Sequence, residues 1–150
     1  MKPTHFEDFV VGDHHELGSF SFTKDEVVEF ARQFDPQPFH IDAAAADASH
    51  FGGLIASGWH TCSRLMRLMC DAYLLDAASG GSPGIEALNW LKPVRPGDVI
   101  TAVRKTIEVK PSRSKLDRGM VLSDTTLTNQ DGEVVMTMRG WLMIFRRNPG

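Results

Sequence analysis

The segment that decides the fold is 57-SGWHTCSRLMRLMCDAYLLDAASGG-81, the most apolar helix-like stretch of the chain. Ser57 is a predicted N-cap, and Gly80-Gly81 is a predicted end, because glycine readily takes the left-handed conformation that closes helices. Its apolar positions cover more than one stripe of a helix: Trp59, Leu65, Met66, Leu68, Met69, Cys70, Ala72, Tyr73, Leu74 and Leu75. We therefore predict a long central helix that the rest of the chain wraps.

The residues after 84 predict the sheet that covers this helix. Segments 84–94, 98–110, 119–129 and 133–146 are rich in β-branched and aromatic residues, as is typical of strands. Pro96-Gly97-Asp98 separates the first two, a basic loop separates the next two, and Asp131-Gly132 indicates a tight hairpin between the last two. Strands and helices do not alternate, so the predicted fold is α+β with an antiparallel sheet.

A strand, two short helices and a loop are predicted before the central helix. Residues 16–23 are strand-like, and Thr23 and Glu26 have the spacing of a capping box, which predicts a helix over residues 24–34. Asp42 precedes an alanine run and is the predicted N-cap of a second short helix. Between them, 34-FDPQPFHID-42 holds two prolines, and we predict a stiff loop without regular structure.

The composition is that of an ordinary globular protein. The chain has 150 residues, is 42% hydrophobic and carries a formal net charge of −3. We expect one domain spanning residues 1–150 and no nucleic-acid partner. No apolar run is long enough to cross a membrane and no signal peptide is recognisable, so we expect no membrane partner and a cytoplasmic location.

The cysteines do not predict a disulfide, and the histidines do not predict a metal site. Cys62 and Cys70 are eight residues apart in the predicted central helix, roughly 12 Å, which is too far for a disulfide. No pair of histidines has metal-ligand spacing supported by other ligands, so no metal is expected. His60, near the start of the helix, is expected to pack in the core or to contact the side chains that form the site.

The stretch 35-DPQPFH-40 resembles a motif of the MaoC-like dehydratases, the family of the R-specific enoyl-CoA hydratases. That family has an aspartate followed by x-Asn-Pro-x-His between an overhanging helix and the central helix, and here Gln37 stands in place of the asparagine. The similarity extends through 6-FEDFVVGD-13, 51-FGGLIASGWHT-61 and 91-LKPVRPGD-98. It implies a hot-dog fold, in which an antiparallel sheet wraps a central helix.

Hydration of a double bond conjugated to a thioester needs a base, an acid and hydrogen-bond donors for the thioester oxygen. Asp35 and His40 supply the base and the acid, held close together by the prolines. The Gly58 N–H is predicted to lie unpaired at the positive end of the central helix, and the resemblance implies that it holds the thioester carbonyl. The predicted catalytic residues are therefore Asp35, His40 and Gly58, and the predicted substrate-binding residues are Gln37, Ser57 and Trp59.

The predicted function is reversible addition of water to a 2-enoyl-CoA or acyl-carrier thioester, giving a 3-hydroxyacyl thioester. No cofactor is expected beyond the coenzyme A of the substrate. The resemblance implies a homodimer in which two sheets join, with the acyl tunnel at the interface; higher assembly is open. Bulky side chains, Trp59 and Trp90 among them, favour short acyl groups.

Two other functions stay open. One is a hot-dog thioesterase, which uses a carboxylate on or near the central helix, where this chain offers Asp71 and Asp76 well past the first turns. The other is a catalytically silent subunit that binds acyl thioesters, which the replacement of asparagine by Gln37 favours. The basic segment 109–119 is either a solvated hairpin or a contact for coenzyme A phosphates.

Overall fold

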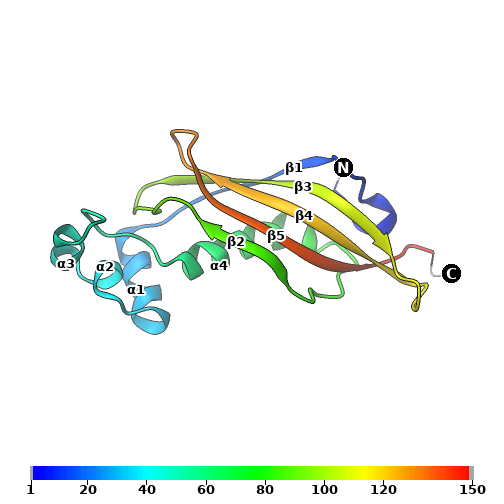
Figure 1. Cartoon of the computed structure of the whole chain (residues 1–150), viewed down its shortest axis with the longest axis horizontal. Coiled ribbons are helices and arrows are strands. Elements are labelled where there is room, and N and C mark those ends of the chain that lie inside the picture. The colour runs from blue at the N-terminus through cyan, green and yellow to red at the C-terminus, as the bar shows by residue number, and fades with distance from the viewer. Residues whose placement is uncertain (1, 149–150) are drawn as a thin grey trace.

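A computed structural model describes residues 2–148. A five-stranded sheet forms one layer, the helix that follows Ser57 lies along one face of it, and three short helices gather beyond one end (Figure 1). The strands are β1 (His14–Ser21), β2 (Ile85–Trp90), β3 (Val99–Pro111), β4 (Arg118–Thr128) and β5 (Val134–Phe145). The helices are η1 (Phe6–Asp8), α1 (Lys24–Phe34), α2 (Pro38–Ile41), α3 (Ala43–Ala48), α4 (Gly58–Met69) and η2 (Cys70–Leu74).

The sheet has the order β1-β3-β4-β5-β2, and every neighbouring pair is antiparallel. The α+β fold with an antiparallel sheet is confirmed. Burial alternates along β3, where residues 100, 102, 104 and 106 are buried against the helix layer. This period of two is what a strand with one covered face requires.

The central helix is shorter than its apolar pattern predicts. It consists of 12 residues of α-helix followed by the five-residue π-helical turn η2, and it stops well before Gly80. Beyond it, the backbone pairs with β5: Gly80 N–H donates to Met143 O at 2.8 Å, and Phe145 N–H donates to Ala78 O at 2.8 Å. A Cβ on Gly80 would lie 2.3 Å from Met143 Cε, so the glycine serves this close approach. The predicted helix end at Gly80-Gly81 is therefore wrong, because β5 offers partners that a further helical turn would leave unused.

The predicted loop over residues 34–42 is also partly wrong. Residues 38–41 form the single turn α2, with Pro38 at its first position. A proline there costs no hydrogen bond, and its fixed φ suits the helix. The other local signals are confirmed: the Thr23–Glu26 capping box starts α1, and Asp42 caps α3 by accepting from the backbone N–H groups of Ala44 and Ala45.

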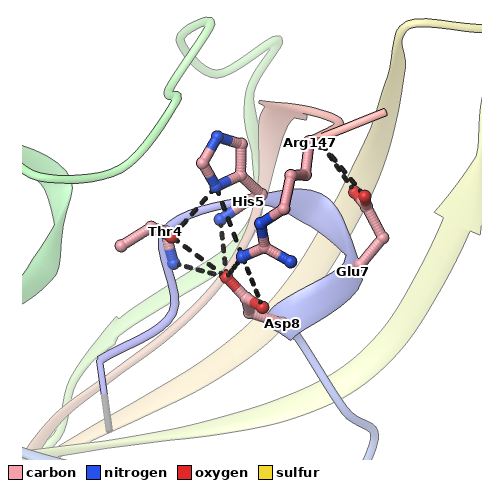
Figure 2. A network of polar contacts seen from close by, with 5 residues as sticks. All are labelled: Thr4, His5, Glu7, Asp8 and Arg147. Atoms are coloured by element: carbon pink, nitrogen blue, oxygen red, sulfur yellow. Dashed lines mark hydrogen bonds and ion pairs between the residues drawn. The ribbon is translucent and has the colours of Figure 1, made fainter. Parts of the chain in front are cut away.

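The segment before β1 and the segment after β5 meet at the end of the sheet opposite the short helices (Figure 1). Figure 2 shows Asp8 at the centre of this contact, where its carboxylate accepts hydrogen bonds from Arg147 Nη2 at 2.8 Å and from the backbone N–H groups of Thr4 and His5, both at 3.0 Å. Burial raises the pKa of Asp8, but these donors lower it by more, so it lies well below its usual value. No helix among residues 2–148 has the length and hydropathy needed to span a bilayer.

We expect Asp8→Asn to lower the free energy of unfolding by about 2 kcal/mol at pH 7, because an ionised hydrogen-bond acceptor is lost. The pKa of Asp8 is depressed in the folded state, so its stabilisation is complete above the unfolded value of about 4 and is lost as pH falls through the folded value. Urea unfolding over a pH series should therefore show wild type and variant converging in acid. A difference that does not change with pH contradicts this account; Asp131→Asn in the exposed hairpin is the control.

Candidate active site

The carboxylate of the site comes from the end of α1. Asp35 is the C-cap residue of that helix, and its N–H donates to Ala31 O at 2.8 Å. Pro36 follows and disfavours further helix, and the chain turns into α2, which carries His40. Asp35 and His40 therefore come from two consecutive helices that a short, proline-containing connection holds together.

His40 is buried and held on both sides. Its Nδ1 lies 2.7 Å from the carbonyl oxygen of Ile55, and its Nε2 lies 3.1 Å from Asp35 Oδ2. The extended segment that supplies this carbonyl is fixed in turn, because Ile55 N–H donates to Phe39 O at 3.3 Å and Ala56 N–H donates to Val94 O at 2.8 Å. The orientation of the imidazole is thus set by backbone as well as by Asp35.

The Asp35 carboxylate accepts from two further side chains. Gln37 Nε2 donates to Oδ1 at 2.7 Å, and Ser57 Oγ donates to Oδ2 at 2.7 Å. Burial raises the pKa of Asp35, but the hydrogen bonds from Gln37 and Ser57 and the proximity of His40 lower it by more, so it lies below its usual value. The carboxylate is therefore ionised at neutral pH.

The groups that contact His40 indicate which of its ring nitrogens carry a proton. A carbonyl oxygen only accepts, so Nδ1 must carry a proton to bond with Ile55. Nε2 lies 3.1 Å from Asp35 Oδ2, and because an ionised carboxylate only accepts, a proton on Nε2 would let it donate across this contact. With both ring nitrogens protonated, His40 would form an ion pair with the Asp35 carboxylate.

Ser57 joins the pair to the central helix. Its side chain is fully buried, accepts from Trp59 N–H at 3.3 Å as the N-cap of α4, and donates to Asp35. Both roles of the hydroxyl are thereby used inside the protein. The predicted N-cap is confirmed, and the geometry gives Ser57 the part of holding Asp35.

Gly58 begins α4 and presents its backbone to the cleft. Among residues 2–148 its N–H has no hydrogen-bond partner, as expected in a first helical turn. A Cβ at this position would lie 2.3 Å from Trp90 Cε2, so only glycine lets the indole pack here. Trp90 also meets Trp59 edge to face, with the ring centroids 5.1 Å apart.

A cleft of about 450 Å³ gathers these groups. Asp35, Gln37, His40, Gly58 and Trp59 line it, whereas Ser57 lies behind them. The structure therefore brings five of the six predicted residues into one cleft, whereas Ser57, predicted to bind substrate, is fully buried and contacts Asp35 instead. Sequence reasoning missed two contributors: the connection after β2, with Leu91, Lys92 and Pro93, and the Ile55 carbonyl. The similarity of residues 91–98 to the family was the available signal for the first; a backbone carbonyl gives none.

The remaining histidine near the site has a packing role. His60 stacks between Phe22 and Phe30, with ring centroids 4.0 and 4.3 Å away, and burial lowers its pKa. Both cysteines are free. Within residues 2–148, no group of three or more His, Cys, Asp or Glu side chains is arranged to hold a metal ion.

The sheet, its helix and this cleft define a hot-dog protein with a carboxylate–imidazole site at the start of the central helix. Residues 10–128 match the family described as MaoC-like domain, and the chain belongs to that family.

Two solved structures show the likeness in space. The MaoC-like dehydratase of Rhodospirillum rubrum is 40% identical, with a TM-score of 0.89 over 96% of this chain and 98% of that one. The (R)-hydratase of A. caviae involved in PHA biosynthesis is 25% identical, with a TM-score of 0.72 over 89% of this chain and 96% of that one. By sequence, the uncharacterized protein YdeM of Bacillus subtilis (strain 168) is 29% identical over 120 residues, which cover 79% of this chain and 84% of YdeM. The hot-dog fold is thereby shown.

Ser57→Ala tests the link between helix and carboxylate. Loss of the N-cap should cost about 1 kcal/mol of stability. Loss of a donor to the ionised carboxylate should also raise the pKa of Asp35 toward its usual value. Urea unfolding and a carbon-13 NMR titration of the Asp35 carboxyl measure the two effects. Ser63→Ala, on the exposed side of the same helix, is the matched control; an Asp35 titration that is the same in both variants would refute the link.

Proposed function

We propose that the protein is an acyl-thioester hydratase or dehydratase, which reversibly adds water to a 2-enoyl thioester to give a 3-hydroxyacyl thioester. The observation that carries the proposal is the ionised Asp35 carboxylate, 3.1 Å from His40 Nε2, in a cleft that also contains the unpartnered Gly58 N–H. The two solved relatives, named a dehydratase and an (R)-hydratase, support the same reaction class.

Asp35 is the proposed base. A carboxylate offers about four acceptor positions. Ser57 and His40 use two on Oδ2, and Gln37 uses one on Oδ1. One position on Oδ1 is left, and a water bound there would give its proton to Asp35 as its oxygen attacks the β-carbon of the enoyl group.

His40 is the proposed acid. In the proposed imidazolium form, Nε2 carries the proton that the α-carbon needs, and the Ile55 carbonyl holds the ring through Nδ1 while Nε2 reacts. After the addition the proton that Asp35 took from water can return to His40 across the same 3.1 Å contact. The catalytic pair is thereby restored without any other proton donor.

The Gly58 N–H is the proposed donor to the thioester oxygen. Negative charge grows on that oxygen as water adds, and the first turn of α4 provides both an open N–H and the positive end of the helix dipole. Removing one such donor typically costs about 10²–10³-fold in rate. Trp59 and Gln37 border the same cleft and would contact the acyl thioester.

The substrate is proposed to be a short 2-enoyl group on coenzyme A or an acyl-carrier protein, and no cofactor beyond that carrier is proposed. The Trp90 indole lies over Gly58 and fills space that a longer acyl chain would need. Lys92 lies at the cleft, paired with Glu133. The basic hairpin between β3 and β4 lies at the other end of the molecule (Figure 1), so it does not serve the cleft of its own chain.

Two alternative functions have weaker support. For a thioesterase, Asp71 and Asp76 lie outside the cleft and pair with Arg67 and Lys2. The feature that favours a silent binding subunit is Gln37 in place of the family's asparagine. However, the Gln37 amide donates a hydrogen bond to the Asp35 carboxylate at 2.7 Å, so the side chain still takes part in the site. Release of free thiol would indicate the first alternative, and thioester binding without turnover the second.

A homodimer or higher homo-oligomer is proposed from the edge strand β2. Its outer side is open, and Ile85 is 53% exposed and Leu91 is 56% exposed. Unpaired, apolar edges are what sheets cover by pairing with another chain. Ile85→Lys should shift sedimentation velocity toward the monomer, and Leu116→Lys in the distant β3–β4 hairpin should not. A wild type that sediments as a monomer at micromolar concentration contradicts this proposal.

The hydratase proposal is tested with purified protein and a short 2-enoyl-CoA, by following the loss of enoyl absorbance. Asp35→Asn and His40→Ala should each lower kcat/KM by about 10³-fold or more, because each removes a proton-transfer group. Asp42→Asn, a nearby carboxylate that caps α3, keeps a good N-cap and should retain activity. Activity that survives in either site variant would overturn the assignment.

Trp90→Ala should widen the cleft above Gly58. We expect the ratio of kcat/KM for medium-chain to short 2-enoyl-CoA to rise by about tenfold, a magnitude typical of added hydrophobic pocket space. Trp141→Phe, on β5 and outside the cleft, is the control. A wild type that prefers medium chains would show that the indole does not limit the acyl group.

A further inference from the structure

An arginine is buried in the core at the other end of the central helix. Arg104 lies on the inner side of β3 and is only 1% exposed. It takes part in none of the ion pairs found among residues 2–148. A buried charge without a counter-ion is costly, and proteins normally pair it.

The surroundings of Arg104 leave one edge of its guanidinium without a hydrogen-bond partner. Nη1 donates to Thr106 Oγ1 at 2.9 Å, while the rings of Phe9 and Tyr73 lie 5.2 and 4.8 Å from Cζ. Nε and Nη2 are buried and have no hydrogen-bond partner among the described residues. These two groups form one side of the planar fork, which matches two oxygens of a carboxylate or phosphate.

A cavity of about 230 Å³ adjoins Arg104. The N-terminal segment, β1 and η2 border it, and Lys2, His15, Glu16 and Tyr73 contribute to its walls. Tyr73 follows Gly58 by fifteen residues, or roughly 22 Å along the helix, so this cavity is separate from the catalytic cleft. We call it the Arg104 pocket.

The charges around the Arg104 pocket favour a small anion. Lys2 is paired with Asp76, so its ammonium is already neutralised. Glu16 is exposed at the rim and would repel a large, multiply charged ligand. The charge of Asp13 acts on Arg104, although the two side chains form no ion pair among residues 2–148. A compact oxyanion would give Arg104 a direct partner at the edge that has no hydrogen bond.

We propose that the Arg104 pocket binds a small oxyanion, a carboxylate or a phosphate group, through paired hydrogen bonds to Arg104 Nε and Nη2. The site is independent of the hydratase reaction. Small carboxylic acids and inorganic phosphate both present the pair of oxygens that such a site would bind, and the test distinguishes between these two ligands.

The test is calorimetric titration of the full chain with acetate and with inorganic phosphate at constant ionic strength, with chloride as the reference. One or both oxyanions should bind saturably with one site per chain, and should raise Tm where chloride does not. Arg104→Met keeps a side chain of similar length but removes the guanidinium donors, so it should weaken binding at least tenfold. Lys105→Met, an exposed neighbour on the same strand, should leave it unchanged.

A second measurement does not depend on the folding of a variant. In the wild type, the nitrogen-15 resonance of Arg104 Nε–H should move along the same saturation curve as the calorimetric signal. A resonance that does not move with either anion would show that only water occupies the pocket and would overturn the proposal. Binding of equal strength in Arg104→Met would also overturn it.

Discussion

The ionised Asp35 carboxylate is the interaction on which the site depends. It takes donors from the start of α4 through Ser57, from α2 through His40, and from the connecting turn through Gln37. Two segments, the stretch of residues 35–41 and the start of α4, therefore converge on one negative charge. The donors keep the carboxylate ionised despite its burial, which is the state that a base requires at neutral pH.

The same charge determines what the neighbouring groups can do. It favours a proton on His40 Nε2, and the Ile55 carbonyl requires one on Nδ1, so the proposed acid lies between two acceptors. Ser57 connects this pair to the first turn of α4, where the Gly58 N–H faces the cleft. The proposed base, acid and oxyanion donor are thus held relative to one another by the protein itself, which is the preorganisation that the proposed reaction needs.

Local chemistry made much of this predictable from sequence. The Thr23–Glu26 capping box, the N-caps at Ser57 and Asp42 and the strand segments rich in β-branched and aromatic residues are short-range patterns, and the structure confirms them. The proximity of Asp35 and His40 follows from a five-residue separation across two prolines. The predicted end of the central helix failed because it depends on β5, a partner more than sixty residues away. The Ile55 carbonyl and the Trp90 indole over Gly58 also arise from long-range packing, for which no local pattern exists.

The ion pair in the resting protein is the central claim, and NMR tests it most directly. The account predicts that at pH 7 the Asp35 carboxyl carbon has the shift of a carboxylate and that both ring nitrogens of His40 have the nitrogen-15 shifts of protonated imidazolium. A protonated Asp35 carboxyl, or a neutral His40 ring with an unprotonated Nε2, would contradict it. In that case base and acid would have to exchange roles, or the pair would not be prepared for water addition at all.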